Sequence, residues 1–182
     1  MGFNINETKP LPPSDADKAA AAINYYRQGS WAQAYLLLSK PEFEKEPASQ
    51  FALGLCRLRA KEQDAAILCF EKALHLIKSL PSLPPEPPEN NETDLRLKKE
   101  QIAERIFLAP MDEDFCRRFP KSAGQMVLLA LIHVYLQKGM TEKAQKLAAG
   151  LTGPEFEEHR KTIFEGGSYQ QPRPKGTGYV GS

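Results

Sequence analysis

Apolar residues recur at the spacing of an α-helix over most of the chain. In the stretch from Ala48 to Leu80, this spacing predicts two helices, 48–60 and 63–79, joined by a turn at Lys61. The same spacing predicts further helices at 14–28, 31–39, 93–108, 122–138, 141–149 and 154–165, and one or two helical turns at 112–119. Capping residues precede the helices at 14–28 and 93–108, and Gly or Pro residues end most of them. The sequence therefore predicts an all-α fold.

Three segments are expected to lie outside regular structure. Five prolines fall within residues 79–92, SLPSLPPEPPENNE, so this segment cannot be helical and is expected to be a linker. Residues 1–13 are interrupted by prolines and are expected to form a flexible leader, and the Gly and Pro residues of 166–182 indicate a disordered tail. The helical domain is thus expected to span 14–165, with the linker inside it.

The predicted turns at Gly29, Lys61 and Gly139 mark three copies of one pattern. An alanine follows five positions after each turn residue: Ala34, Ala66 and Ala144. The interval from position 61 to position 139 is more than twice the interval from position 29 to position 61. The longer interval has room for about one inserted repeat between the second and third units.

The middle unit resembles a tetratricopeptide repeat (TPR). Six of its residues fall at the spacing of that family: Leu53, Gly54, Ala66, Phe70, Ala73 and Leu74. The chain departs from the pattern at Arg57, where an aromatic is usual, and at Ala21-Ala22, where Leu-Gly is usual. The resemblance implies helical hairpins stacked as a short solenoid, with an inserted linker and extra helix and a C-terminal capping helix. The alternative is an ordinary helical hairpin of a bundle.

The TPR resemblance also implies a concave groove that holds an extended peptide and is lined by the first helix of each unit. Carried over to this sequence, the partner-binding positions are Ile23, Tyr26, Arg27, Phe51, Leu55, Leu58, Arg59, Met126, Leu129 and His133, with Leu136 beside them. TPR domains that grip acidic C-termini use Lys, Asn and Arg where this chain has Ala19, Ile23 and Ala52. We therefore expect a mostly apolar groove, rimmed by Arg27 and Arg59, that binds a hydrophobic segment.

This groove chemistry resembles that of the small TPR chaperones that hold translocator subunits of bacterial type III secretion. The resemblance implies a chaperone or adaptor whose partner is a protein or peptide, and it leaves room for a weak homodimer. Two alternatives stay open. The protein could be a structural scaffold subunit of a larger assembly, or residues 80–85 or the tail could lie in the groove until a partner displaces them.

Composition narrows the function classes further. Charged residues make up 26% and hydrophobic residues 41% of the chain, with a formal net charge of +1 and the two signs mixed, so nucleic acid is not an expected partner. No apolar stretch approaches the roughly 20 residues that cross a bilayer, and the N-terminus lacks the pattern of a secretory signal. We therefore expect no membrane insertion and a cytoplasmic location.

The residues that commonly carry catalysis show no catalytic pattern. Cys56, Cys69 and Cys116 form no CxxC pair and are expected to be buried and reduced, although Cys56 and Cys69 lie on one predicted hairpin and a redox pair is conceivable. The run Asp112–Asp114 is expected to cap a helix rather than to bind a metal. The three histidines lie far apart and within no known catalytic motif: His75, His133 and His159. We expect no enzymatic activity, no metal and no cofactor.

Overall fold

The computed structural model describes residues 15–81 and 106–165, and every regular element in these two ranges is helical, as predicted. The α-helices are α1 (Asp15–Arg27), α2 (Trp31–Leu38), α3 (Pro47–Arg59), α4 (Gln63–Lys78), α6 (Glu113–Arg118), α7 (Pro120–Gln137), α8 (Thr141–Ala148) and α9 (Glu157–Phe164). Three 3₁₀ turns complete the list: η1 (Pro41–Phe43), η2 (Ile106–Leu108) and η3 (Pro154–Phe156). Within the described ranges, no helix is long and apolar enough to span a bilayer.

Most predicted helix boundaries lie within two residues of the observed ones. The helix predicted at 154–165 differs, because its first three residues form η3, which turns Phe156 into the core before α9 begins. Of the helix predicted at 93–108, the described residues show only η2. The rest of that helix, the leader, the tail and nearly all of the predicted linker lie outside the described residues.

The three predicted turn residues share one backbone conformation. Gly29, Lys61 and Gly139 have φ values of 83°, 64° and 71°, in the left-handed region. Each turn closes with the same pair of hydrogen bonds: Ser30 N to Tyr25 O and Gly29 N to Tyr26 O, Glu62 N to Arg57 O and Lys61 N to Leu58 O, and Met140 N to Tyr135 O and Gly139 N to Leu136 O. This is the Schellman ending of a helix, which reverses the chain after α1, α3 and α7.

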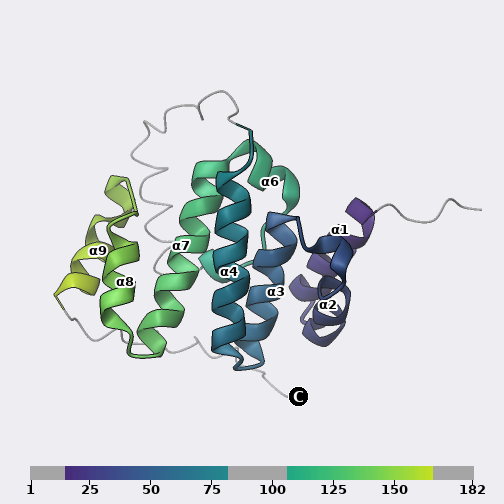
Figure 1. Ribbon diagram of the computed structural model, residues 1–182, viewed down its shortest axis with the longest axis horizontal. Coiled ribbons are helices and arrows are strands. Elements are labelled where there is room, and N and C mark those ends of the chain that lie inside the picture. The colour runs from purple at the N-terminus through teal and green to yellow at the C-terminus, as the bar shows by residue number, and fades with distance from the viewer. Residues whose placement is uncertain (1–14, 82–105, 166–182) are drawn as a thin grey trace, which may run out of the picture.

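Each turn joins two packed helices, α1 with α2, α3 with α4 and α7 with α8 (Figure 1). The alanine five positions after each turn is fully buried, so the second helix approaches the first closely: Ala34, Ala66 and Ala144. Gly54 of α3 also allows a close approach, because a Cβ atom there would lie 2.5 Å from the ring of Phe70 in α4. Small residues at these positions therefore set the distance between paired helices.

The third hairpin packs directly on the second, although residues 79–119 lie between them in the sequence. Helix α7 lies against α4, and polar side chains reinforce the contact. Tyr135 Oη donates a hydrogen bond of 3.0 Å to Glu71 Oε1, and Lys138 forms an ion pair with Asp64. The inserted segment is thus accommodated without separating the two hairpins.

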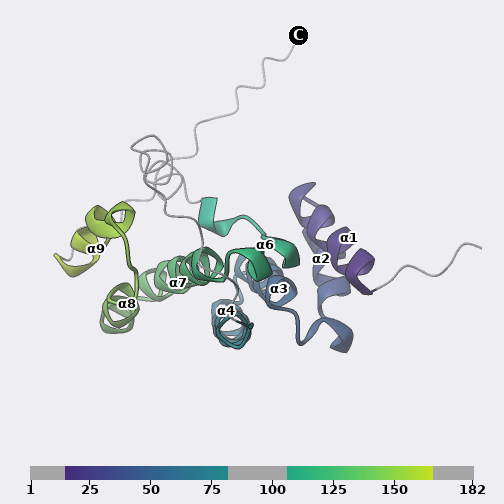
Figure 2. The same cartoon turned by 90° about the horizontal axis from the view of Figure 1, so that it is seen from above.

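The helices form a shallow arc, with α1 and α9 at its two ends (Figure 2). Helices α1, α3 and α7 lie toward one side of the arc, which we call the inner face, and α4 and α8 lie toward the other side. Both η2 and α6 lie on the inner face, where η2 contacts α7 and α6 contacts α3 and α7. Residues 106–119, which we call the inner segment, therefore cover part of the surface where the groove was expected.

The inner segment is fixed in place by burial and by backbone contacts. Phe107, Met111 and Cys116 are buried. Glu113 Oε2 accepts a hydrogen bond of 3.3 Å from Ala48 N, in the first turn of α3. The predicted cap is confirmed, because the Asp112 carboxylate accepts a hydrogen bond of 2.8 Å from the backbone N–H of residue 115 at the start of α6.

Candidate binding pocket on the inner face

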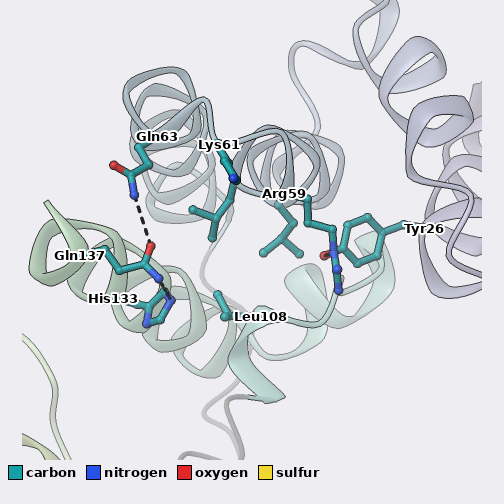
Figure 3. Close-up of a pocket in the computed structure, with 9 residues that line it drawn as sticks. Tyr26, Arg59, Lys61, Gln63, Leu108, His133 and Gln137 are labelled. Atoms are coloured by element: carbon teal, nitrogen blue, oxygen red, sulfur yellow. Dashed lines mark hydrogen bonds between the residues drawn. The ribbon is translucent and has the colours of Figure 1, made fainter. Parts of the chain in front are cut away.

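The inner segment leaves one end of the inner face uncovered, and a cavity of about 760 Å³ lies there. We call it the inner-face pocket. It lies beside the turn between α3 and α4, and its lining comes from α1, α3, α4, η2 and α7 (Figure 3). The lining residues are Tyr26, Leu55, Leu58, Arg59, Lys61, Gln63, Leu108, His133 and Gln137.

The helical spacing of α3 explains why three of its residues reach the pocket. Leu55, Leu58 and Arg59 are three and four positions apart, so they lie on one side of the helix. Leu55 is buried, Leu58 is half-buried and Arg59 is exposed. These three residues give the pocket an apolar floor and a charged rim.

The Arg59 guanidinium lies close to two aromatic rings. Its Cζ lies 3.9 Å from the centroid of the Trp31 ring and 5.5 Å from that of the Tyr26 ring. Its Nε donates a hydrogen bond of 3.1 Å to Tyr26 Oη. Burial raises the pKa of Tyr26 above its ordinary value, and the nearby guanidinium opposes that shift. At neutral pH the phenol is therefore uncharged.

Amide and imidazole groups line the side opposite Arg59 (Figure 3). Gln137 Nε2 lies 3.0 Å from His133 Nε2, and Gln63 Nε2 donates to Gln137 Oε1 at 3.5 Å. The ring of Phe107 packs edge-on to His133, with centroids 6.1 Å apart. His133 is therefore a buried packing residue whose ring edge reaches the pocket.

The charged residues of the lining are all positive. Arg59 and Lys61 are exposed at the rim, and the lining includes neither Asp nor Glu. Among the residues that the structure describes, neither Arg59 nor Lys61 forms an ion pair. Chemically, the pocket combines an apolar floor, amide groups on one wall and two cations at the rim.

The structure places five of the ten expected partner-binding residues around this pocket: Tyr26, Leu55, Leu58, Arg59 and His133. The other five lie elsewhere. Phe51 packs against Phe70 in the interface between α3 and α4, with ring centroids 5.5 Å apart. Ile23 and Leu129 are buried, Met126 packs partly buried against the core, and Arg27 donates a hydrogen bond of 3.4 Å to Pro110 O.

Four lining residues were not among the expected ones: Lys61, Gln63, Leu108 and Gln137. Lys61 was recognised only as a turn residue, although its place directly after α3 puts it at the same end as Arg59. Leu108 belongs to the inner segment, and no local pattern indicates which surface that segment covers. Residues 80–85 and the tail, the alternative occupants of the groove, lie almost wholly outside the described residues.

The described part of the chain holds no group of three or more His, Cys, Asp or Glu side chains that could bind a metal ion. Cys56, Cys69 and Cys116 are free and buried, as expected.

In comparisons with known proteins, no family model, no curated protein and no solved structure matches the chain. Its function is therefore inferred from its own residues and geometry.

Proposed function

We propose that the protein is a protein-interaction module, a TPR-like chaperone or adaptor that holds an extended segment of a partner protein at the inner-face pocket. The supporting observation is that one cavity of about 760 Å³ is lined by residues of α1, α3 and α7 that the TPR resemblance assigns to partner binding. A cavity of this size accommodates a few side chains. Because the inner segment covers the neighbouring surface, the partner contacts a shorter stretch than an open groove would offer.

The proposal is tested with a phage-displayed library of short random peptides selected against the protein. Leu55 and Leu129 are buried, so charged variants there would disturb the fold, whereas Leu58 is half-buried in the pocket. We expect Leu58→Glu to weaken binding of the selected peptides by about tenfold or more, because a carboxylate would replace the apolar floor. Fluorescence anisotropy of labelled synthetic peptides measures this change.

The matched control is Leu68→Glu, on the exposed side of α4 and outside the pocket. This variant should bind the peptides as the wild type does, and circular dichroism should show both variants to be equally helical. Failure of the library to yield any binder would contradict the proposal. Equal loss of binding in both variants would show that the pocket is not the binding site.

A scaffold subunit is the second candidate, because two exposed leucines occupy equivalent places on α2 and α4. Leu36 and Leu68 follow their respective turn residues at the same distance in sequence, and these residues are 69% and 65% exposed. A permanent assembly would bury such side chains. Light scattering would then find the wild type in an oligomer that Leu68→Glu dissociates, whereas an adaptor would show the same mass for both proteins.

A further inference from the structure

We infer that the inner-face pocket recognises an acidic side chain, Asp or Glu, next to an apolar side chain within an extended segment of the partner protein. This inference rests on the proposed function, because it specifies the chemistry of the partner that the same pocket binds. It goes further in one respect: the apolar floor alone would bind any hydrophobic segment, whereas the rim selects for negative charge.

Charge complementarity is the first argument. Arg59 and Lys61 lie at the rim, and the lining supplies no acidic residue. Several other cations of the described chain have carboxylate partners, including Lys138 with Asp64 and Lys72 with Glu44. A carboxylate that enters the pocket would meet two positive charges without first displacing an internal ion pair.

The fixed position of Arg59 is the second argument. Stacking on Trp31 and the hydrogen bond from Nε to Tyr26 Oη hold the guanidinium in place before any ligand arrives. That hydrogen bond uses one of the five N–H donors of the side chain and leaves the donors on the two terminal nitrogens for a carboxylate. Because little side-chain freedom remains to be lost, a carboxylate can be bound at a low entropic cost.

The remaining lining residues indicate what accompanies the acid. Leu55, Leu58 and Leu108 provide apolar surface for a neighbouring side chain. Gln63 and Gln137 carry amide groups that can both donate to and accept from the backbone of an extended segment. The bond between these two amides is long, 3.5 Å, so exchanging it for a bond to a ligand costs little.

The test uses the selected peptides, synthesised with an acetylated N-terminus and an amidated C-terminus, so that side chains supply the only carboxylates. Each peptide is paired with a form in which Asn or Gln replaces every Asp or Glu. Fluorescence anisotropy compares both forms on the wild type, on Arg59→Gln and on Lys61→Asn. Asn is chosen at position 61 because it tolerates the left-handed φ of 64°.

We expect neutralisation of the peptide acid to weaken binding to the wild type by about tenfold. Arg59→Gln should cause a similar loss, and on that variant the neutral and acidic peptides should bind alike. Lys61→Asn should show a smaller loss of the same kind. The control is Lys146→Gln, which removes an exposed charge of α8 outside the pocket and should leave both affinities unchanged.

The outcomes separate this inference from the proposed function. The acidic specificity would be overturned if the selected peptides contained no acid. It would also be overturned if they bound the wild type and Arg59→Gln equally, while Leu58→Glu weakened their binding. Either result would leave the proposed function intact. A third peptide form, with a free C-terminal carboxylate, completes the test. If only this form binds, the ligand is a chain terminus and the inference fails. If no peptide binds in any form, the proposed function fails with it.

Discussion

At the scale of single residues, two glycines inside helices have opposite surroundings. A Cβ atom on Gly54 would lie 2.5 and 2.6 Å from two carbons of the Phe70 ring, which is fully buried and packs on Phe51. A Cβ atom on Gly124 of α7 would lie 3.9 Å from its nearest neighbours, Ile77 and Leu74, at ordinary contact distance. Gly54 is thus required for packing, whereas Gly124 only lowers helix propensity.

We expect Gly54→Ala to lower the free energy of unfolding by up to about 2 kcal/mol. Overpacking of a rigid core costs roughly 1–3 kcal/mol, and the gain in helix propensity from Gly to Ala, about 1 kcal/mol, offsets part of it. Gly124→Ala should instead raise the free energy of unfolding by about 0.5–1 kcal/mol. Urea unfolding of both variants measures the two changes, and the same sign for both would contradict the packing argument.

Residues whose role is local were predictable from the sequence. Gly29, Lys61 and Gly139 were aligned as turn residues, and all three have a left-handed φ. The Asp112 cap was predicted from acids at the start of a short helix. Leu108 was missed, since its role depends on contacts between distant parts of the chain.

At the scale of elements, α9 covers the end of the arc. Ile163 of α9 is buried, and its carbonyl accepts a hydrogen bond of 3.4 Å from Gln145 Nε2 of α8. Arg160 Nη1 donates to Leu151 O at 3.1 Å. The next residue along the helix after Ile163, Phe164, is 52% exposed. Ile163 therefore marks the side of α9 that is attached, and Phe164 marks the free side.

The change from Ile163 to Asp should detach α9. An unpaired carboxylate at a buried position costs several kcal/mol, so we expect the free energy of unfolding to fall by about 3 kcal/mol, with self-association through the uncovered side of α8. Phe164→Asp is the matched control and should change the free energy of unfolding by less than about 0.5 kcal/mol. Thermal melts compare the stability of the two variants, and analytical ultracentrifugation compares their self-association. Equal stability of the two variants would show that α9 does not cover the end of the arc.

Element packing also explains why only half of the expected partner-binding residues reach the pocket. The TPR resemblance assigns one inward-facing surface to α1, α3 and α7, and residues near the turns, such as Leu58 and Arg59, remain accessible there. Farther along that surface, α6 packs against α3 and α7, and Phe107 and Met111 of the inner segment are buried. Helical periodicity indicates which side of a helix is apolar, but it does not indicate which distant segment covers that side.

At the scale of the whole molecule, buried thiol and phenol groups make the stability of the core depend on pH. Cys56, Cys69 and Cys116 lie in the hydrophobic core that the described helices share. Burial raises the thiol pKa from its ordinary 9.0 to about 11 at Cys56 and about 12 at Cys116, and it also raises that of Cys69. Burial, with the hydrogen bond to Glu71, raises the pKa of Tyr135 to about 12.

These shifts predict that the protein loses stability in mild alkali. Above about pH 9 the thiols of the unfolded chain lose their protons, while those of the folded chain keep them, so a rise in pH favours unfolding. The stabilisation is complete below about pH 9 and is lost as the pH approaches the folded-state values of about 11 and 12. Each thiol adds a slope of up to about 1.4 kcal/mol per pH unit.

The measurement is urea unfolding under reducing conditions at several pH values between about 8 and 10, the range in which the thiols of the unfolded chain lose their protons. The free energy of unfolding of the wild type should change little up to about pH 9 and should fall above it. Cys116→Ala should fall less steeply, because one of the three shifted thiols is absent, even though the cavity it leaves lowers its stability at every pH. A wild-type free energy that stays constant from pH 8 to 10 would show that these thiols are not protected by the shared core.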